Sequence, residues 1–503
     1  MDSAQWFITA TRGRLKYLLI SLLLLAPCYW QPRLQAGDLS SHIYNAWLAQ
    51  LIESGRADGL TIVRQTTNVL FDVMLSVLFR WFGAEWAQRI AVSIAVLTFV
   101  WGAFGFVSVV ARGRAWHLLP CIAMLAYGTV FHMGFFNFYL SMGLCFWAMR
   151  LAWEVSPRRL TVAVLLLTLA YVAHALPVVW TIGLLVYAPI ARRLSRLGRA
   201  HLTAAFVLGI AGVHAAMARL FVTQWSPSQL ALSTGVDQVW VFDGKYYILL
   251  AGLLAVWGLL FLGLVKQRGV REVVGSVPFH LCVIAAATVC VLPGAVLLPG
   301  FSHSLGYIGE RMSLGVAICV CALLAAFPPR ALERYAILLV AAVFFGFLYR
   351  DERALNALED RMQDVVSTVP EGARIVVLMH DPELRINPLT HMIDRVCIGR
   401  CYSYANYEPC TRQFRVRATR PNPIVVSTYK ESWSLQTGEY LPVQQDLPLY
   451  AVEADRNGRM EIKILKAGLR NGLTQLSVFG KRLPTSERAN GISRADQPQR
   501  ARS

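Results

Sequence analysis

The sequence predicts an α-helical polytopic membrane protein of about eleven membrane-spanning helices, followed by a small C-terminal α/β domain outside the membrane. Hydrophobic residues make up 56% of the 503 positions and charged residues only 16%, whereas soluble domains carry about 25% charged residues. Apolar runs near the length of a bilayer-spanning helix recur until about residue 350. Lys and Arg cluster after every second run, as the positive-inside rule requires of loops on the cytoplasmic side.

The first apolar segment covers residues 18–30 and follows Arg12, Arg14 and Lys16. We therefore expect a cytoplasmic N-terminus and an outward first crossing. Pro27 stands directly before Cys28, where lipoprotein processing requires a small residue, and no small-x-small cleavage site follows. An uncleaved first helix is therefore favoured over a signal peptide.

Ten further apolar segments complete the predicted membrane domain, which covers residues 1–350. They are residues 90–110, 118–131, 135–153, 160–173, 176–190, 202–222, 246–265, 273–297, 312–327 and 335–349. Basic clusters follow the even-numbered segments and all fall on the cytoplasmic side if the segments alternate. The third, fifth and sixth segments are short, which favours tilted or partly re-entrant helices.

Three regions then lie outside the membrane: residues 31–89, residues 223–245, and everything after residue 350. Helical spacing of apolar residues over 41–52 and 67–82 predicts two helices along the membrane surface in the first outer loop.

The last region, residues 351–480, is predicted to be an extracytoplasmic α/β domain. Its first part, 351–369, has the apolar spacing of an amphipathic helix. Residues 374–378 and 423–427 are expected to form buried strands, and residues 449–454 and 460–465 a hairpin around Asn457-Gly458. The polar segment 481–503 is expected to be a disordered tail.

Three of the ten cysteines, Cys397, Cys401 and Cys410, fall in the predicted outer domain. An oxidising compartment would allow one disulfide and leave one thiol, and the sequence does not decide which pair forms. Three cysteines without a clear fourth ligand make a weak zinc site.

The pattern Gly37-Asp38-Leu39-Ser40-Ser41-His42 places an acid and an imidazole just outside the first span. Asp38 is a candidate general base or ligand for a divalent cation. His42 lies four residues on and could share a proton or metal with it on one helix face. The alternatives are that Asp38 caps the following helix and that His42 is an ordinary surface residue.

Further polar groups gather at the outer ends of the spans, which favours a site at that face. The candidates for substrate binding are His132, Asn137, His174, His303 and Arg311. Arg311 could bind a phosphate through two parallel hydrogen bonds, or instead anchor at lipid headgroups or pair with Glu310. Each histidine could equally be an interfacial residue bonded to backbone or water.

The formal net charge of +18 resides largely in short loops, so we assign it to topology and expect the bilayer rather than nucleic acid as the partner. No basic–aromatic nucleic-acid module is recognised. The sequence leaves the oligomeric state open.

Three segments together resemble the GT-C superfamily of polytopic glycosyltransferases, most closely its bacterial members. They are Gly37-Asp38 through Trp47, Gly134-Phe135-Phe136-Asn137-Phe138, and Glu310-Arg311-Met312. The order of one helix, an outer loop opening with an acid, surface helices, many spans and an outer domain is also similar.

The resemblance implies an enzyme of the bacterial inner membrane that moves a sugar from a polyprenyl-phosphate carrier to an acceptor on the extracytoplasmic face. It implies that Asp38 is the general base or metal ligand and that Arg311 contacts the carrier phosphate. Many members have paired acids in this loop, whereas Leu39 follows Asp38 here, so metal dependence stays open. The rival hypotheses are a lipid or polysaccharide transporter or flippase, and a non-catalytic membrane scaffold.

Overall fold

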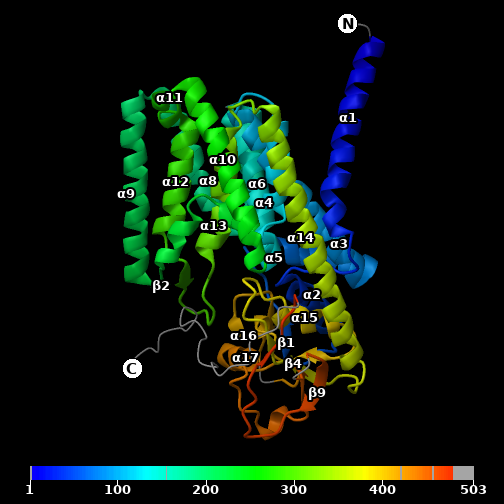
Figure 1. The fold of residues 1–503 in the computed structure, drawn as a ribbon. Helices are drawn as coiled ribbons and strands as arrows, with labels where there is room; N and C mark the ends of the chain where they lie inside the picture. The colour runs from blue at the N-terminus through cyan, green and yellow to red at the C-terminus, as the bar shows by residue number, and fades with distance from the viewer. Residues whose placement is uncertain (1–2, 155, 420–421, 456–457, 480–503) are drawn as a thin grey trace.

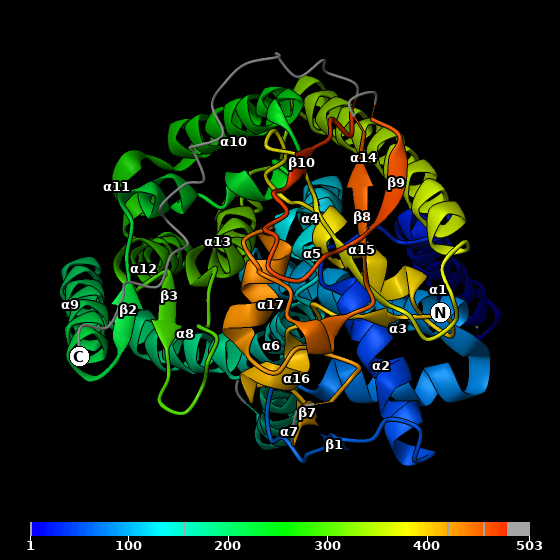
Figure 2. The same ribbon diagram turned by 90° about the horizontal axis from the view of Figure 1, so that it is seen from below.

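The computed structural model describes residues 3–154, 156–419, 422–455 and 458–479, and these residues are mostly helical (Figure 1). Long helices form a bundle, and a mixed region of short helices and strands lies at one end of it. Viewed from that end, the mixed region lies over α4, α5 and α6 and leaves α9 and α12 uncovered (Figure 2). The predicted tail, residues 481–503, lies outside the described residues.

Five helical stretches within the described chain are long and apolar enough to cross a membrane. They are α3 (Leu70–Val110), α8 (Ala175–Arg193), α9 (Arg196–Leu220), α10 (Tyr247–Arg268) with the turn before it, and α14 (Ala331–Val366). α12 (Val277–Val291) is apolar but shorter. The chain therefore has the character of a helical membrane protein, while the number of eleven spans stays a prediction.

The other apolar segments are also largely helical. They form α1 (Ser3–Leu25), α4 (Leu119–Ala126), α5 (Thr129–Met133), α6 (Phe136–Trp153), α7 (Pro157–Ala173), α11 (Val270–Val274) and α13 (Ile308–Leu324). The expected ninth span, 273–297, is an exception, because its helix α12 ends at Val291 and its last residues form the strand β3 (Ala295–Leu297). The segment expected as one helix over 118–131 is broken at Gly128. A Cβ atom at Gly128 would lie 2.5 Å from the carbonyl oxygen of Gln238, so the break lets another backbone segment approach closely.

α3 joins two elements that the sequence analysis separated, the surface helix at 67–82 and the span at 90–110. The helix changes direction at Gly83, whose φ of 74° is outside the helical range. Trp81 and Trp86 beside the bend are largely exposed. The part before the bend carries amphipathic spacing, and glycine permits the turn that an L-residue would resist.

α14 likewise continues through the predicted domain boundary at residue 351 and ends at Val366. After it, β4 (Arg374–Val377) lies between β6 (Tyr402–Ser403) and β8 (Leu449–Ala454), parallel to both, and β9 (Met460–Ile464) pairs antiparallel with β8. The strands expected at 374–378, 449–454 and 460–465 are therefore present. We call the described chain after α14 the C-terminal region.

The strand expected at 423–427 is wrong, because this segment forms bends rather than a ladder. Pro423 has no N–H to donate, and the Asn422 side chain accepts hydrogen bonds from the backbone N–H groups of Ile424 and Val425 at 3.0 and 3.2 Å. Local side-chain bonds of this kind compete with strand pairing.

Residues 31–89, which we continue to call the first outer loop after their predicted position, make extensive contacts with the C-terminal region. β1 (Leu60–Ile62) pairs antiparallel with β7 (Val416–Ala418), and α2 (Leu39–Glu53) packs against α15 (Leu389–Val396). The expected helix at 41–52 is thus confirmed as α2. The remaining elements are η1 (Ala26–Cys28), η2 (Trp116–Leu118), β2 (Val222–Gln224), η3 (Pro227–Leu232), η4 (Val236–Val239), η5 (Gly244–Tyr246), β3 (Ala295–Leu297), β5 (Met379–His380), α16 (Glu408–Thr411), α17 (Tyr429–Gln436), η6 (Gln444–Asp446) and β10 (Thr474–Gln475).

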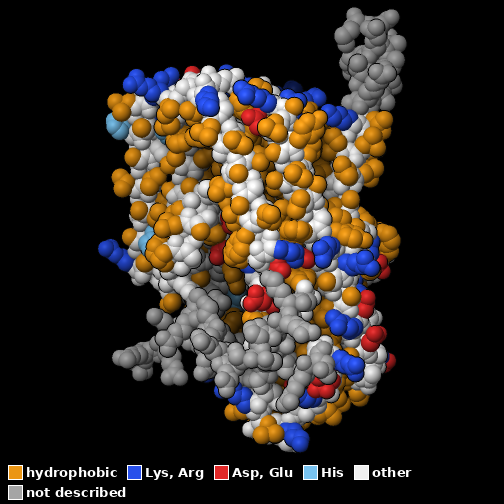
Figure 3. All heavy atoms as spheres, in the orientation of Figure 1, with side chains coloured by type: hydrophobic (Ala, Val, Ile, Leu, Met, Phe, Trp, Pro, Cys, Tyr) orange, Lys and Arg blue, Asp and Glu red, His pale blue; other side chains and the backbone are white. Residues whose placement is uncertain are grey.

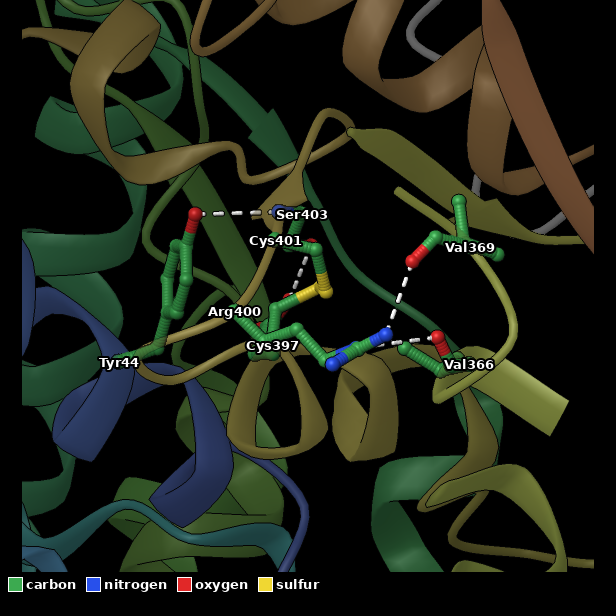
Figure 4. Close-up of a disulfide and its surroundings, with 8 residues drawn as sticks. Tyr44, Val366, Val369, Cys397, Arg400, Cys401 and Ser403 are labelled. Atoms are coloured by element: carbon green, nitrogen blue, oxygen red, sulfur yellow. Dashed lines mark hydrogen bonds between the residues drawn. A yellow bond between two sulfur atoms is a disulfide. The ribbon is translucent and has the colours of Figure 1, made fainter. Parts of the chain in front are cut away.

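The disulfide that the sequence left unassigned joins Cys397 and Cys401, and Cys410 is free. It closes the short turn between α15 and β6 (Figure 4). Beside it the Ser403 N–H donates to the Tyr44 hydroxyl of α2 at 3.0 Å. The bridge therefore stands where the C-terminal region meets the first outer loop.

Candidate functional site

The backbone before α2 rests on the turn between α5 and α6. Gly37 N–H donates to the His132 carbonyl at 2.7 Å, and Asp38 N–H donates to the Met133 carbonyl at 3.1 Å. Gly134 in that turn has a φ of +83°, and a Cβ atom there would lie 2.4 Å from the Asp38 nitrogen. Two of the motifs singled out in the sequence are thus packed backbone to backbone.

We expect Gly134→Ala to lower the free energy of unfolding, because the left-handed backbone alone costs an L-residue about 1–2 kcal/mol and the methyl group would also displace Asp38. Gly209→Ala is the control, since within the described residues nothing outside the helix backbone around Gly209 in α9 lies within 4 Å of its Cβ position. Thermal unfolding of the two purified variants tests this. Equal midpoints for both variants and the wild type would contradict the packing.

Asp38 occupies the N-cap position of α2, but its side chain makes no capping hydrogen bond. Its side chain is 25% exposed, and Oδ1 lies 3.6 Å from Nε2 of His391 in α15. The capping alternative therefore does not account for this carboxylate, which faces the C-terminal region and remains accessible.

Arg311 lies in the first turn of α13, with its guanidinium 3.7 Å above the ring of Phe135. Its Nε atom is buried and has no hydrogen-bond partner. Within the described residues the guanidinium forms no hydrogen bond or ion pair, but it attracts the Asp38 carboxylate electrostatically. A cation held on an aromatic face with unused donors is suited to bind an anion.

His303 and Tyr407 complete this grouping. Their rings stack at 5.6 Å, and Tyr407 is also 5.6 Å from His391. Burial lowers the pKa of His303, whose ring is influenced by both Asp38 and Arg311, so His303 is neutral near pH 7. We call Asp38, His303, Arg311, His391 and Tyr407 the junction site, because they lie where the helix bundle meets the C-terminal region.

His42 and Asn137 belong to a neighbouring cluster around Asp72 of α3. His42 Nδ1 lies 2.6 Å from Asp72 Oδ1, and Asn137 Nδ2 donates to Asp72 Oδ2 at 2.7 Å. The Asn137 oxygen accepts the Phe71 N–H at 2.8 Å. Burial lowers the pKa of His42, but Asp72 outweighs burial and raises it to about 9. The expected sharing of a proton or metal by His42 and Asp38 is therefore replaced by an ion pair of His42 with Asp72.

A cavity of about 10 Å³ lies beside this cluster, lined in part by His42, Asp72, Glu408 and Arg415. The Ser41 hydroxyl donates to Glu408 at 3.3 Å, and burial raises the pKa of the Glu408 carboxyl. The cavity has room for about one water molecule. It is a buried polar contact between α2, α3 and the C-terminal region, and is too small for a substrate.

His132 and His174 form hydrogen bonds with backbone groups. His132 is fully buried, with Nδ1 3.0 Å from the Gln35 carbonyl. His174 caps α8 by accepting the Leu176 N–H at 3.2 Å, and its carbonyl accepts the Ser141 hydroxyl at 2.8 Å. Both histidines thus bond to the backbone, as the alternative predicts. Nε2 of His132, however, is buried without a hydrogen-bond partner among the described residues and lies 4.0 Å from a Glu352 carboxylate oxygen.

Of the seven residues selected from the sequence, the structure thus brings together Asp38, His303 and Arg311. His391 and Tyr407, which join them, were not selected. The one available signal was the spacing of His391 and Asp394, which puts an imidazole and a carboxylate one helical turn apart.

Metal binding has limited support from the geometry. Within the described parts of the chain, no group of three or more His, Cys, Asp and Glu residues could hold a metal ion. Asp38 and His391 would supply two protein ligands, fewer than a structural zinc site has. A hydrated divalent cation needs only one or two protein carboxylates beside a substrate phosphate, so metal dependence stays open.

Comparisons with known proteins give no assignment: no protein-family model, curated protein or solved structure matches the chain.

Proposed function

We propose that the protein is an integral membrane glycosyltransferase of the GT-C type, which moves a sugar from a polyprenyl-phosphate carrier to an acceptor on the extracytoplasmic face. The observation that carries the proposal is the pairing at the junction site of an accessible carboxylate, Asp38, with a guanidinium, Arg311, that has no anionic partner among the described residues. One group suits a base and the other a leaving phosphate.

The proposal includes eleven spans with the N-terminus in the cytoplasm of a bacterial cell and the C-terminal region outside. Lys and Arg side chains gather along the rim of the bundle opposite the C-terminal region (Figure 3). Arg192 and Arg193 end α8, and Lys266 and Arg268 end α10. Such a basic rim is typical of a cytoplasmic face, which supports an extracytoplasmic junction site.

The chemistry follows from the two side chains. Asp38 removes the proton from an acceptor hydroxyl, and the oxygen attacks the anomeric carbon of the sugar. The bond between that carbon and the phosphate oxygen breaks, and the electron pair leaves with the phosphate. Arg311 neutralises the charge that develops on the phosphate. The proton ends on Asp38, so the step balances without an added reagent.

An open apolar groove of about 270 Å³ supports a lipid-borne donor. It is lined by Leu220, Phe221 and Val222 at the end of α9 and by the stretch from Leu297 to Phe301. That stretch leads along the chain to His303 and Arg311. A prenyl chain in the groove would therefore lie on the same loop that reaches the junction site.

The test of this function compares lipid-linked sugars and surface glycans by mass spectrometry in cells with the gene, without it, and with it restored. Loss of the gene is expected to leave a polyprenyl-phosphate sugar unused and one glycan shorter or undecorated. Restoration should reverse both changes. Unchanged glycans together with a redistribution of labelled lipid between leaflets would show a flippase and contradict the proposal.

A further inference from the structure

The C-terminal region places an imidazole between two carboxylates at the junction site. His391 Nδ1 lies 2.9 Å from Asp394 Oδ2, one turn along α15, and Nε2 lies 3.6 Å from Asp38 Oδ1. The His391 side chain is 14% exposed and that of Asp394 only 2%. The ring therefore joins a buried acid of the C-terminal region to the accessible acid of the first outer loop.

α15 is fixed in place by the residue after Asp394. Arg395 makes a bidentate contact with Glu359 of α14 at 2.6 and 2.7 Å, and also donates to the Leu34 carbonyl at 2.8 Å. Leu34 is four residues before Asp38. The same arginine thus ties α15 to the chain segment that presents Asp38, which sets the distance between His391 and Asp38.

Asp394 is itself held by a second contact. The Ser403 hydroxyl donates to the other carboxylate oxygen of Asp394. Ser403 stands just after the disulfide that closes the turn behind α15 (Figure 4). Because Ser403 and His391 contact different oxygens of Asp394, its carboxylate is fixed in one orientation. Its contact with His391 Nδ1 leaves the other ring nitrogen, Nε2, directed at Asp38.

The charged and titratable groups around His391 favour its cationic form. Burial opposes the charge, but Asp394, Asp38 and Glu408 outweigh burial and raise the pKa of His391. Tyr407, the residue before α16, lies next to the His391 ring. Burial raises the pKa of Tyr407, so its hydroxyl is neutral near pH 7. Asp38 also acts electrostatically on Arg311 and His303, which are the other titratable groups of the junction site.

We propose that His391 is a positioning residue for Asp38: its imidazolium, held by Asp394, donates from Nε2 to one Asp38 oxygen and turns the other toward the acceptor hydroxyl. The inference rests on the proposed function. A separation of 3.6 Å is longer than a hydrogen bond, and such contacts commonly tighten when substrate binds. The C-terminal region would then complete the active site instead of merely covering it.

The first test is the pH dependence of sugar transfer. Membranes containing the protein receive the lipid extract of deletion cells as donor. His391 positions Asp38 only when its ring is protonated, and its pKa is raised. We therefore expect kcat to stay constant at pH values below that pKa and to fall as the pH rises through it. His391→Asn and His391→Gln should lower kcat, leave KM for the donor unchanged, and remove this alkaline fall. Asp394→Asn should move the fall to lower pH.

His380→Asn is the matched control, since His380 contacts Asn387 and lies outside the junction site. It should keep the wild-type profile. If both His391 variants kept the wild-type kcat and the same alkaline fall, the inference would be overturned.

The second test does not depend on transfer. Exchange of the imidazole Cε1 hydrogen for deuterium, read by mass spectrometry of peptides from the purified full-length protein, gives the titration midpoint of each histidine. Asp38→Asn should lower the midpoint of His391 and leave that of His380 unchanged. An unchanged His391 midpoint would contradict the contact. Full transfer activity in Asp38→Asn would instead refute the proposed function, so the two failures are distinguishable.

Discussion

Replacing Asp38 by asparagine is expected to abolish sugar transfer while the protein remains in the membrane at wild-type abundance. Asparagine has the same shape but cannot accept the acceptor's proton, and loss of a general base costs about 10²–10⁴ in rate. The fold should tolerate the change, because the Asp38 side chain makes no capping bond in α2. Transfer is measured in deletion cells that carry the variant, with protein abundance followed by immunoblotting.

Glu85→Gln is the matched control for this experiment. Glu85 also lies in the first outer loop, its side chain is 63% exposed, and it forms an ion pair with Arg89 on the same helix. The variant loses one carboxylate of that loop and should transfer sugar normally. Wild-type activity in Asp38→Asn would exclude Asp38 as the base.

Replacing Arg311 by glutamine is expected to weaken binding of the carrier by about 10- to 100-fold, since hydrogen bonds to charged groups contribute about 1.5–3 kcal/mol. The guanidinium would offer a phosphate its unused donors above the Phe135 ring. Arg311→Lys should recover part of the loss, because it keeps the charge but loses the planar fork. Binding of a polyprenyl phosphate to the purified protein in lipid nanodiscs measures the effect.

Arg80→Gln supplies the comparison, because the Arg80 side chain in α3 is 51% exposed, pairs with Glu53 and lies outside both the junction site and the apolar groove. It removes the same charge near the same face and should leave carrier affinity unchanged. Equal losses in the two variants would show a general effect of surface charge and not a phosphate contact at the junction site.

Much of the helical bundle could be predicted, because the length of a continuous apolar run can be measured directly on the sequence. Most of the expected apolar segments are helical, and the strands β4, β8 and β9 lie where apolar runs and a turn signal predicted them. The points where helices break or continue were harder to predict, because they depend on tertiary contacts. Gly128 breaks a helix to admit the Gln238 carbonyl, and α3 and α14 each run through a boundary that composition alone suggested.

The candidate site shows the same division. Asp38 and Arg311 could be selected because topology assigned both to one membrane face. His391 and Tyr407 could not, since they reach Asp38 only through long-range contacts such as the bond from Arg395 to the Leu34 carbonyl. His42 was paired with Asp38 by helical spacing, but Asp72 lies closer to its ring and binds it.

The most direct test of the junction site is an electron cryomicroscopy structure of the protein in nanodiscs with a polyprenyl phosphate bound. We expect phosphate density within hydrogen-bonding distance of the Arg311 guanidinium, on the side of the site that faces Asp38. Phosphate bound at another face of the bundle, with Arg311 and Asp38 both unoccupied, would contradict it.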